Sequence, residues 1–193
     1  IRIMKILESL ENRRTHYDIN RDLPVGEEEV FDLIKRATEL VPDAFDMKSS
    51  RVIVAVGEKQ EQLWNNIYDV FGGKVSREKI DSFKNGYGTI LYFYDSETVK
   101  NLQNQFTQYA DRFPDWAIQS SGMLQLSIWS GLKELGIGAS LQHYNPIIDE
   151  MVRKMFNLSD NYILNAQMPF GGIGSYPDEK EKEDISNRVK IVR

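Results

Sequence analysis

One stretch, residues 121–135, decides the architecture of this chain, and it reads Ser121-Gly122-Met123-Leu124-Gln125-Leu126-Ser127-Ile128-Trp129-Ser130-Gly131-Leu132-Lys133-Glu134-Leu135. Its apolar residues lie all around a helix instead of along one stripe, so more than one face of that helix must be buried. The small residues Ser127, Ser130 and Gly131 let another helix approach closely. We therefore expect the central helix of the fold here, packed in a core and equally suited to a subunit interface.

On both sides of this helix, helical and strand patterns alternate. Helices are expected around residues 6–10, 30–41, 63–71 and 147–156. Strands are expected at residues 88–94, 137–141, 162–168 and 52–56, and the last of these is a β-branched run typical of a buried strand. The pattern predicts an α+β or α/β domain of three layers, without repeats or an internal linker.

The two ends of the chain differ in character from its middle. Ile1-Arg2-Ile3 precede Met4, a natural start, so we expect a cloning remnant there and a single domain over residues 4–193. Charged residues fill positions 178–184, and residues 189–192 alternate like a strand. Residues 175–193 are therefore expected to form a charged loop and an extended arm, which packs across the domain or onto a second subunit.

Composition argues against several classes of function. Of the 193 residues, 41% are hydrophobic and 27% are charged, as in an ordinary globular protein. A net charge of −5 argues against a broad nucleic-acid surface, and the chain has neither a signal peptide nor the run of ~20 apolar residues that a membrane helix needs. We expect a cytoplasmic protein. Without cysteine, and with only His16 and His143, a metal site is not expected.

A basic cluster, Asn12-Arg13-Arg14-Thr15-His16-Tyr17, follows the first expected helix. The guanidinium groups of Arg13 and Arg14 match the shape of a phosphate monoester, and Thr15 adds a hydroxyl donor. The cluster therefore indicates a phosphorylated ligand. The plainer alternative is an arginine pair that balances the helix dipole or forms a solvated corner. No dinucleotide fingerprint or Walker loop is present, because Gly136-Ile137-Gly138 follows a helix and not a strand.

Four segments, taken in order, resemble one family. They are Arg13-Arg14-Thr15, the loop Ala44-Phe45-Asp46-Met47-Lys48-Ser49, the turn Gly136-Ile137-Gly138-Ala139-Ser140, and Phe170-Gly171-Gly172 with the lysines of the tail. Together they resemble the FMN-dependent nitroreductase family over nearly the whole chain. The segment Ala166-Gln167-Met168-Pro169-Phe170-Gly171-Gly172 most resembles its short subgroup related to fatty-acid-repression proteins. The resemblance implies an α+β fold of three α/β/α layers, a mainly antiparallel central sheet flanked by helices, and a homodimer that shares two flavin sites.

The resemblance also implies which residues hold the FMN. The basic cluster and one tail lysine would hold the phosphate and the ribityl chain. The residues are Arg13, Arg14, Thr15, Tyr17 and either Lys180 or Lys182. Near the flavin ring the family has a Ser-x-Asn-x-Gln pattern, from which this chain departs with Asp46 and Lys48. Asp46 can accept a hydrogen bond from flavin N3–H, and Lys48 can lie by N1 and O2. The resemblance implies that the backbone of Leu141, Gln142 and His143 faces flavin N5.

The implied activity is hydride transfer from NADH or NADPH, through FMN, to a nitroaromatic, a quinone or a similar electron-poor aromatic. Donor and acceptor use one pocket in turn, in a ping-pong mechanism, and no catalytic side chain is expected because the flavin carries the chemistry. The alternatives are a non-catalytic FMN sensor or reservoir, which the altered loop at Asp46 and Lys48 favours, and a dimer without a cofactor.

Some features keep two interpretations. Gly136 and Gly138 fit a helix C-cap and a tight turn as well as a flavin-facing segment, and His143 is either an acid or a packed or exposed ring. Trp129, within an apolar pattern, is expected in the core. The aromatic residues of the polar stretch 102–116 line either a substrate pocket or a contact with a partner subunit, and they are Phe106, Tyr109, Phe113 and Trp116.

Overall fold

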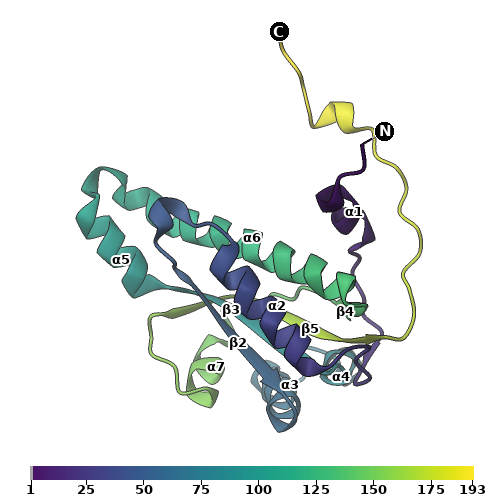
Figure 1. Ribbon diagram of the computed structural model, residues 1–193. Helices are drawn as coiled ribbons and strands as arrows, with labels where there is room; N and C mark the ends of the chain where they lie inside the picture. Colours follow the sequence, from purple (N-terminus) through teal and green to yellow (C-terminus); the bar gives the residue numbers. More distant parts are fainter. Residues whose placement is uncertain (1) are drawn as a thin grey trace.

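The computed structural model describes residues 2–193, so that Ile1, the first residue of the expected remnant, lies outside them. A five-stranded sheet forms the middle layer (Figure 1), in the order β1-β5-β3-β2, with β4 also paired to β5. All these pairings are antiparallel, as the resemblance implied. The strands are β1 Ile19–Asn20, β2 Ser50–Val56, β3 Gly88–Asp95, β4 Ile137–Ala139 and β5 Tyr162–Ile173.

Helices cover both faces of this sheet, and they are α1 Lys5–Asn12, α2 Glu27–Leu40, α3 Glu58–Phe71, α4 Arg77–Lys84, α5 Ser96–Gln105, α6 Phe113–Glu134 and α7 Asp149–Met155. The central helix α6 begins earlier than expected. Two helices, α4 and α5, were not expected, because each has only two large apolar residues, Ile80 and Phe83 in α4 and Val99 and Leu102 in α5. Each begins at a side-chain cap: Ser76 accepts from the N–H of Lys79, and Asp95 accepts from the N–H of Glu97.

Strand β3 divides the core in two by simple alternation. Ile90 and Tyr92 pack on one face with α2 and α6, whereas Leu91 and Phe93 pack on the other face with α3, α4 and α7. Each of these four side chains is at most 1% exposed. The result is a helix–sheet–helix sandwich of three layers, in which α6 lies over the upper face in Figure 1.

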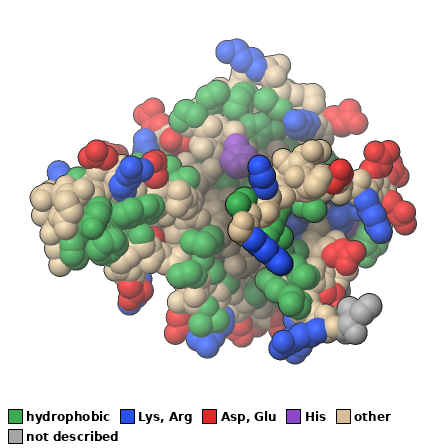
Figure 2. All heavy atoms as spheres, turned by 90° about the horizontal axis from the view of Figure 1, so that it is seen from above, with side chains coloured by type: hydrophobic (Ala, Val, Ile, Leu, Met, Phe, Trp, Pro, Cys, Tyr) green, Lys and Arg blue, Asp and Glu red, His purple; other side chains and the backbone are tan. Residues whose placement is uncertain are grey.

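The small residues of α6 let one neighbouring helix, α2, approach closely, as the sequence predicted. A Cβ atom on Gly131 would lie 2.6 Å from Leu33 of α2, so the two helices approach where the side chain is absent. On the remaining face, Ile118, Met123 and Leu126 stay exposed. Figure 2 looks onto the upper side of the molecule and shows hydrophobic side chains uncovered between charged ones. The sequence predicts that more than one face of α6 is buried, but within one chain this apolar face stays exposed.

Strand β2 and the tail are covered less than the sequence predicted. Most β2 side chains are half-buried, and only Ala55 is buried, so the expected buried strand is an edge strand with β3 on one side. Residues 189–193 form no strand and are exposed, and the tail runs away from the body in Figure 1. None of the helices between residues 2 and 193 combines the length and apolar character that a membrane crossing requires.

Candidate functional site

The basic cluster lies in an extended segment beside β4. After α1 ends, the N–H of His16 donates to the carbonyl oxygen of Ala139 at 2.9 Å, and Thr15 forms a parallel bridge with the same residue. Successive side chains of an extended segment point to opposite sides. Arg13 and Thr15 therefore lie on one side of this segment, and Arg14 and His16 lie on the other.

Arg13 is held by an aromatic ring. Its guanidinium carbon lies 4.2 Å from the ring centroid of Trp129, whose indole N–H donates to the carbonyl oxygen of Ala139 at 3.2 Å. This cation–π contact fixes the plane of the guanidinium group. Burial lowers the pKa of Arg13, and the charge of Arg14 lowers it further, so a negative ligand would be favoured here.

Arg14 and His16 contact the tail. An Nη2 donor of Arg14 lies 2.6 Å from the carbonyl oxygen of Asp178, and the ring of His16 meets the edge of Tyr176 at a centroid distance of 5.3 Å. The ammonium group of Lys133 lies 5.5 Å from the same tyrosine ring. These contacts bring the start of the tail beside the arginines, although Lys180 and Lys182 themselves are exposed and make no ion pair or hydrogen bond within residues 2–193.

Several buried side-chain nitrogens of this cluster make no hydrogen bond to the described residues. Among the described residues, Arg13 Nη1, Arg14 Nε and both ring nitrogens of His16 are buried without a hydrogen bond. An unpaired buried donor costs about 1 to 3 kcal/mol, and more when it is charged. Burial lowers the pKa of His16, and the charges of Lys133, Arg14 and Arg13 add to this effect, while the backbone of Ser175 opposes it. The donor set and its positive surroundings fit a phosphate group.

The loop before β2 is built differently, on strained backbone. Phe45, Asp46 and Lys48 all have left-handed φ angles, of 55°, 49° and 53°. Such angles cost roughly 1 to 2 kcal/mol for a residue with a Cβ atom, and they concentrate at functional sites. Asp43 holds the loop closed, because its carboxylate accepts from the N–H of Ala44 at 2.8 Å and from the N–H and hydroxyl of Ser49 at 2.9 and 2.6 Å.

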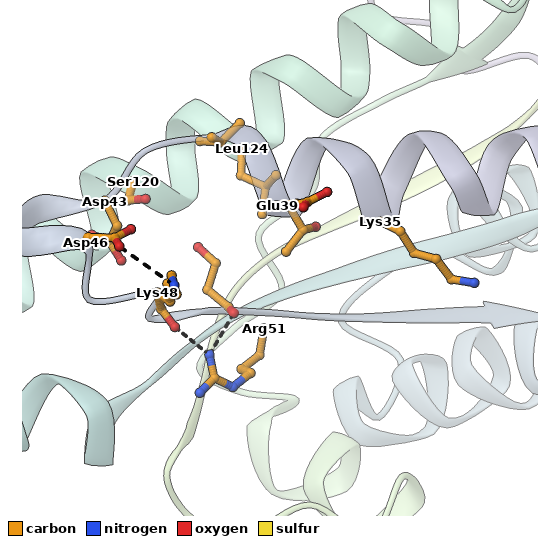
Figure 3. Close-up of a pocket in the computed structure, with 11 residues that line it drawn as sticks. Lys35, Glu39, Asp43, Asp46, Lys48, Arg51, Ser120 and Leu124 are labelled. Atoms are coloured by element: carbon orange, nitrogen blue, oxygen red, sulfur yellow. Dashed lines mark hydrogen bonds and ion pairs between the residues drawn. The ribbon is translucent and has the colours of Figure 1, made fainter.

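A cavity of about 450 Å³ adjoins this loop (Figure 3), between the end of α2, the start of β2 and α6. Asp46 and Lys48 form an exposed ion pair of 3.7 Å at its rim. The guanidinium group of Arg51 donates to the carbonyl oxygen of Lys48 at 2.7 Å, which supports the left-handed turn. Ser120 of α6 donates to the carbonyl oxygen of Pro42 at 2.8 Å and ties the loop to the central helix.

The aromatic residues of the polar stretch pack against this loop in their own chain. Phe45 is surrounded by four rings with centroid distances between 4.7 and 5.9 Å, and these belong to Phe106, Tyr109, Phe113 and Trp116. Phe113 is buried, whereas Phe45 and Tyr109 stay 48% and 44% exposed. The sequence suggested a substrate pocket or a partner contact for these rings and did not anticipate Phe45, whose left-handed backbone turns it toward them.

The segment that follows β4 runs along β5. The N–H of Gln142 donates to the carbonyl oxygen of Gln167 at 2.7 Å, and the N–H of Gln167 donates back at 2.9 Å. Leu141 is half-buried and His143 is exposed. Because Thr15 pairs with Ala139, this segment and the basic cluster are neighbours. Tyr17 is exposed, and its ring lies 6.4 Å from that of Phe83.

The predicted site residues therefore form two groups. The basic cluster and residues 141–143 lie near the C-terminal end of α6, where Trp129 contacts Arg13. Asp46 and Lys48 lie near its other end, where Ser120 lines the cavity. Nine residues of helix separate Ser120 from Trp129, and at 1.5 Å per residue this is about 14 Å. One chain does not bring the two groups together.

Comparison with known proteins identifies the family. The model of the nitroreductase family matches residues 10–172. The chain belongs to the nitroreductase family. The nitroreductase CinD from Lactococcus lactis, in complex with chloramphenicol, superposes with a TM-score of 0.93 and 41% sequence identity, over 98% of this chain and 100% of that chain.

Two further nitroreductases are of yeast origin. Nitroreductase FRM2 of Saccharomyces cerevisiae is 28% identical over 179 residues, which cover 90% of this chain and 91% of FRM2. A nitroreductase structure from Saccharomyces cerevisiae superposes with a TM-score of 0.78 at 27% identity, over 86% of this chain and 94% of that chain. The resemblance drawn from the sequence segments and the α+β nitroreductase fold are confirmed, and the chain is a flavin-dependent oxidoreductase in general terms.

Sequence reasoning gave no role to three residues of the candidate site. Trp129, expected in the core, is half-buried and stacks on Arg13. His16 was quoted within the basic cluster without a role of its own, but it is 1% exposed and contacts the tail. Gln167 was not singled out, although an amide inside the apolar run Ala166–Phe170 is a usable signal, since buried polar side chains are the informative exceptions.

Proposed function

We propose that this nitroreductase binds FMN and passes electrons from NADH or NADPH to nitroaromatics, quinones or similar electron-poor aromatics. The observation that carries the proposal is the set of buried, unpaired donors on Arg13, Arg14 and His16. A bound FMN supplies the redox chemistry, because its ring accepts hydride from the nicotinamide and returns the electrons to the acceptor.

The residues of this chain then bind and orient. Arg13 and Thr15 face one side of the extended segment and would hold the phosphate, with Arg14 beside them and Tyr17 at the end of the segment. The hydrogen bond from Arg14 to Asp178 supports a tail lysine as a further cation, either Lys180 or Lys182. Residues 141–143 would lie along the ring. No side chain is required to transfer a proton or to form a covalent bond.

We propose that the working form is a homodimer. Within one chain Asp46 and Lys48 lie away from the basic cluster, and an isologous pair can place the loop of one subunit at the cluster of the other. Three exposed features support such a pairing. They are the apolar residues of α1 and α6 (Ile6, Leu7, Ile118, Met123, Leu126), the free edge of β2, and the tail with exposed Val189 and Ile191.

The acceptor class is proposed from the loop and from CinD. CinD structures hold chloramphenicol and 4-nitrophenol. Here the exposed rings of Phe45 and Tyr109, next to the cavity at Asp46 and Lys48, offer aromatic surface to a planar acceptor. In a dimer this surface would lie beside the flavin of the partner.

An anaerobic absorption experiment tests the proposal. The purified protein is loaded with FMN, desalted, and treated with NADH or NADPH and then with 4-nitrophenol. We expect the yellow colour to survive desalting, to bleach with the nicotinamide and to return with the acceptor. Flavin that stays bound but is not reduced by either nicotinamide would favour a non-catalytic FMN-binding protein, and the ion pair between Asp46 and Lys48 would then be the first feature to change. Absence of retained flavin would overturn the assignment of the phosphate site.

A further inference from the structure

Gln167 is a buried polar residue in an apolar part of strand β5. It stands in the run Ala166-Gln167-Met168-Pro169-Phe170, and its side chain is completely buried. A buried amide must find partners for both its oxygen and its nitrogen, because each unpaired group costs about 1 to 3 kcal/mol. The partners of Gln167 are therefore informative.

Both ends of this amide bond to the segment that follows β4. The oxygen Oε1 accepts from the backbone N–H of Tyr144 at 2.7 Å, and Nε2 donates to Oδ1 of Asn145 at 3.0 Å. The backbone of Gln167 exchanges two hydrogen bonds with Gln142. Gln167 thus holds this segment at Gln142 through its main chain and at Tyr144 through its side chain.

The effect is a regular alternation of backbone donors. The N–H groups of Ser140, Gln142 and Tyr144 all point to β5, where they bond to Pro169 and Gln167. The N–H groups of Leu141 and His143 make no hydrogen bond within residues 2–193, and in an extended segment they point the other way. Without the side chain of Gln167 the alternation would end at Gln142.

We propose that Gln167 is a positioning residue for the flavin ring. Its side chain fixes the Tyr144 end of the segment, so that the N–H groups of Leu141 and His143 are presented in a set direction to the ring. This inference rests on the proposed function, because it takes residues 141–143 as the flavin-facing segment. It assigns Gln167 no contact with flavin or substrate.

The test compares Gln167→Met with Gln60→Met. Methionine keeps the length of glutamine and removes both hydrogen-bonding groups. Gln60 is a matched control, because it is also buried and fully bonded, to Thr89 and to the carbonyl of Phe83, but it lies between α3, α4 and β3. Three quantities are measured on each variant: amide hydrogen exchange without flavin, the FMN dissociation constant, and the midpoint potential and visible spectrum of bound FMN.

We expect Gln167→Met to expose the Tyr144 amide to exchange, to shift the flavin potential and spectrum, and to lower kcat by about tenfold to 100-fold while FMN affinity stays near that of the wild type. Gln60→Met should lose stability but keep the wild-type potential and spectrum. If both variants shift the flavin equally, or neither does, the positioning role is overturned.

Two further measurements keep the inference separable from the proposed function. If Gln167→Met does not fold, Gln167→Glu retains the acceptor for Tyr144 and should keep that amide protected. In the wild-type protein without flavin, the Tyr144 amide should exchange far more slowly than that of His143, and equal rates would contradict the inference whether or not any variant folds. Wild-type protein that retains no FMN, but protects Tyr144, would overturn the proposed function and leave the contact of Gln167 intact as a structural one.

Discussion

The basic cluster, residues 13–17, and the loop, residues 43–49, satisfy their polar groups in opposite ways. In the cluster the backbone is ordinary, but Arg13, Arg14 and His16 have buried donors without protein partners. In the loop three residues have left-handed backbone, yet Asp43 closes the turn with three hydrogen bonds. Arg51 and Ser120 add hydrogen bonds to backbone carbonyls of the same segment. The cluster would therefore gain stability from a ligand, whereas the loop is held by contacts within its own chain.

The difference teaches which kind of change each region tolerates. Removing the guanidinium group of Arg13 should weaken ligand binding and leave the fold intact, because its loss removes the contact with Trp129 but no side-chain hydrogen bond within residues 2–193. Removing Asp43 should disturb the fold first, since the strained backbone at Phe45 and Asp46 then has nothing to hold it. Four predictions follow this contrast from the largest effect to the smallest.

Arg13→Ala should weaken FMN binding by about 100-fold, equivalent to about 2.7 kcal/mol, because a charge-assisted and preorganised contact is lost. The melting temperature of the flavin-free protein should stay near that of the wild type. Titration of FMN by fluorescence quenching measures the affinity. Arg36→Ala is the control, since Arg36 is an exposed arginine paired with Glu39 on α2. Unchanged FMN affinity in Arg13→Ala would refute the phosphate-site assignment.

Asp43→Ala should lower the free energy of unfolding by about 2 to 3 kcal/mol, because buried Ser49 loses its partner and the helical turn loses its cap. For a chain of this length that corresponds to a fall in Tm of about 4 to 12 °C. Asp184→Ala is the matched control. Asp184 caps a similar turn and bonds Ser186 in the same way, but in the exposed tail. Equal and small losses in both variants would mean that Asp43 does not hold the strained loop.

Lys180→Ala and Lys182→Ala should each be compared with Lys74→Ala, an exposed lysine between α3 and α4. The lysine that serves the phosphate should, when removed, lower FMN affinity by about two- to fivefold, since an exposed charge contributes about 0.5 to 1 kcal/mol. The effect should fade at high salt. If neither tail variant differs from Lys74→Ala, the tail contributes to the site only through the contact of Asp178 with Arg14.

The smallest effect concerns pH. Burial lowers the pKa of His16, so the unfolded chain binds the proton more readily than the folded chain. The stability that neutral His16 contributes is present above the ordinary histidine pKa of about 6.5 and is lost as the pH falls through the lowered value. Wild-type protein should therefore lose more stability between about pH 7.5 and about pH 5.5 than His16→Gln. His143→Gln, at an exposed position, should keep the wild-type slope, and an equal slope in His16→Gln would contradict the prediction.

The sequence predicted those parts of the nitroreductase whose signal is local. Strand β3 and helix α6 are visible as apolar segments, because β3 is covered on both faces and α6 packs on α2 and on the sheet. The basic cluster was found because two adjacent arginines in an acidic chain are a local feature as well. Helices α4 and α5 were missed because their caps, and not their periodicity, mark them.

The rest depends on contacts between residues far apart in the chain. Nothing near Phe45 indicates a left-handed backbone, which is set by Asp43 and by the rings of Phe106 and Trp116. The stacking of Arg13 on Trp129 joins the first helix to the central one. The contact of Gln167 with Tyr144 likewise exists only after β4 and β5 have paired. Such interactions leave no spacing that a single sequence could show.

The position of β5 in the sequence has a consequence for when the protein can fold. It pairs with β1, β3 and β4, so Ile19 finds its partner Ile173 only after the residues between them have been made. A chain still on the ribosome lacks the strand beside which the basic cluster lies, and such late, distant pairing makes folding slow. A ligand of the basic cluster can therefore be bound only after β5 has been made and has paired.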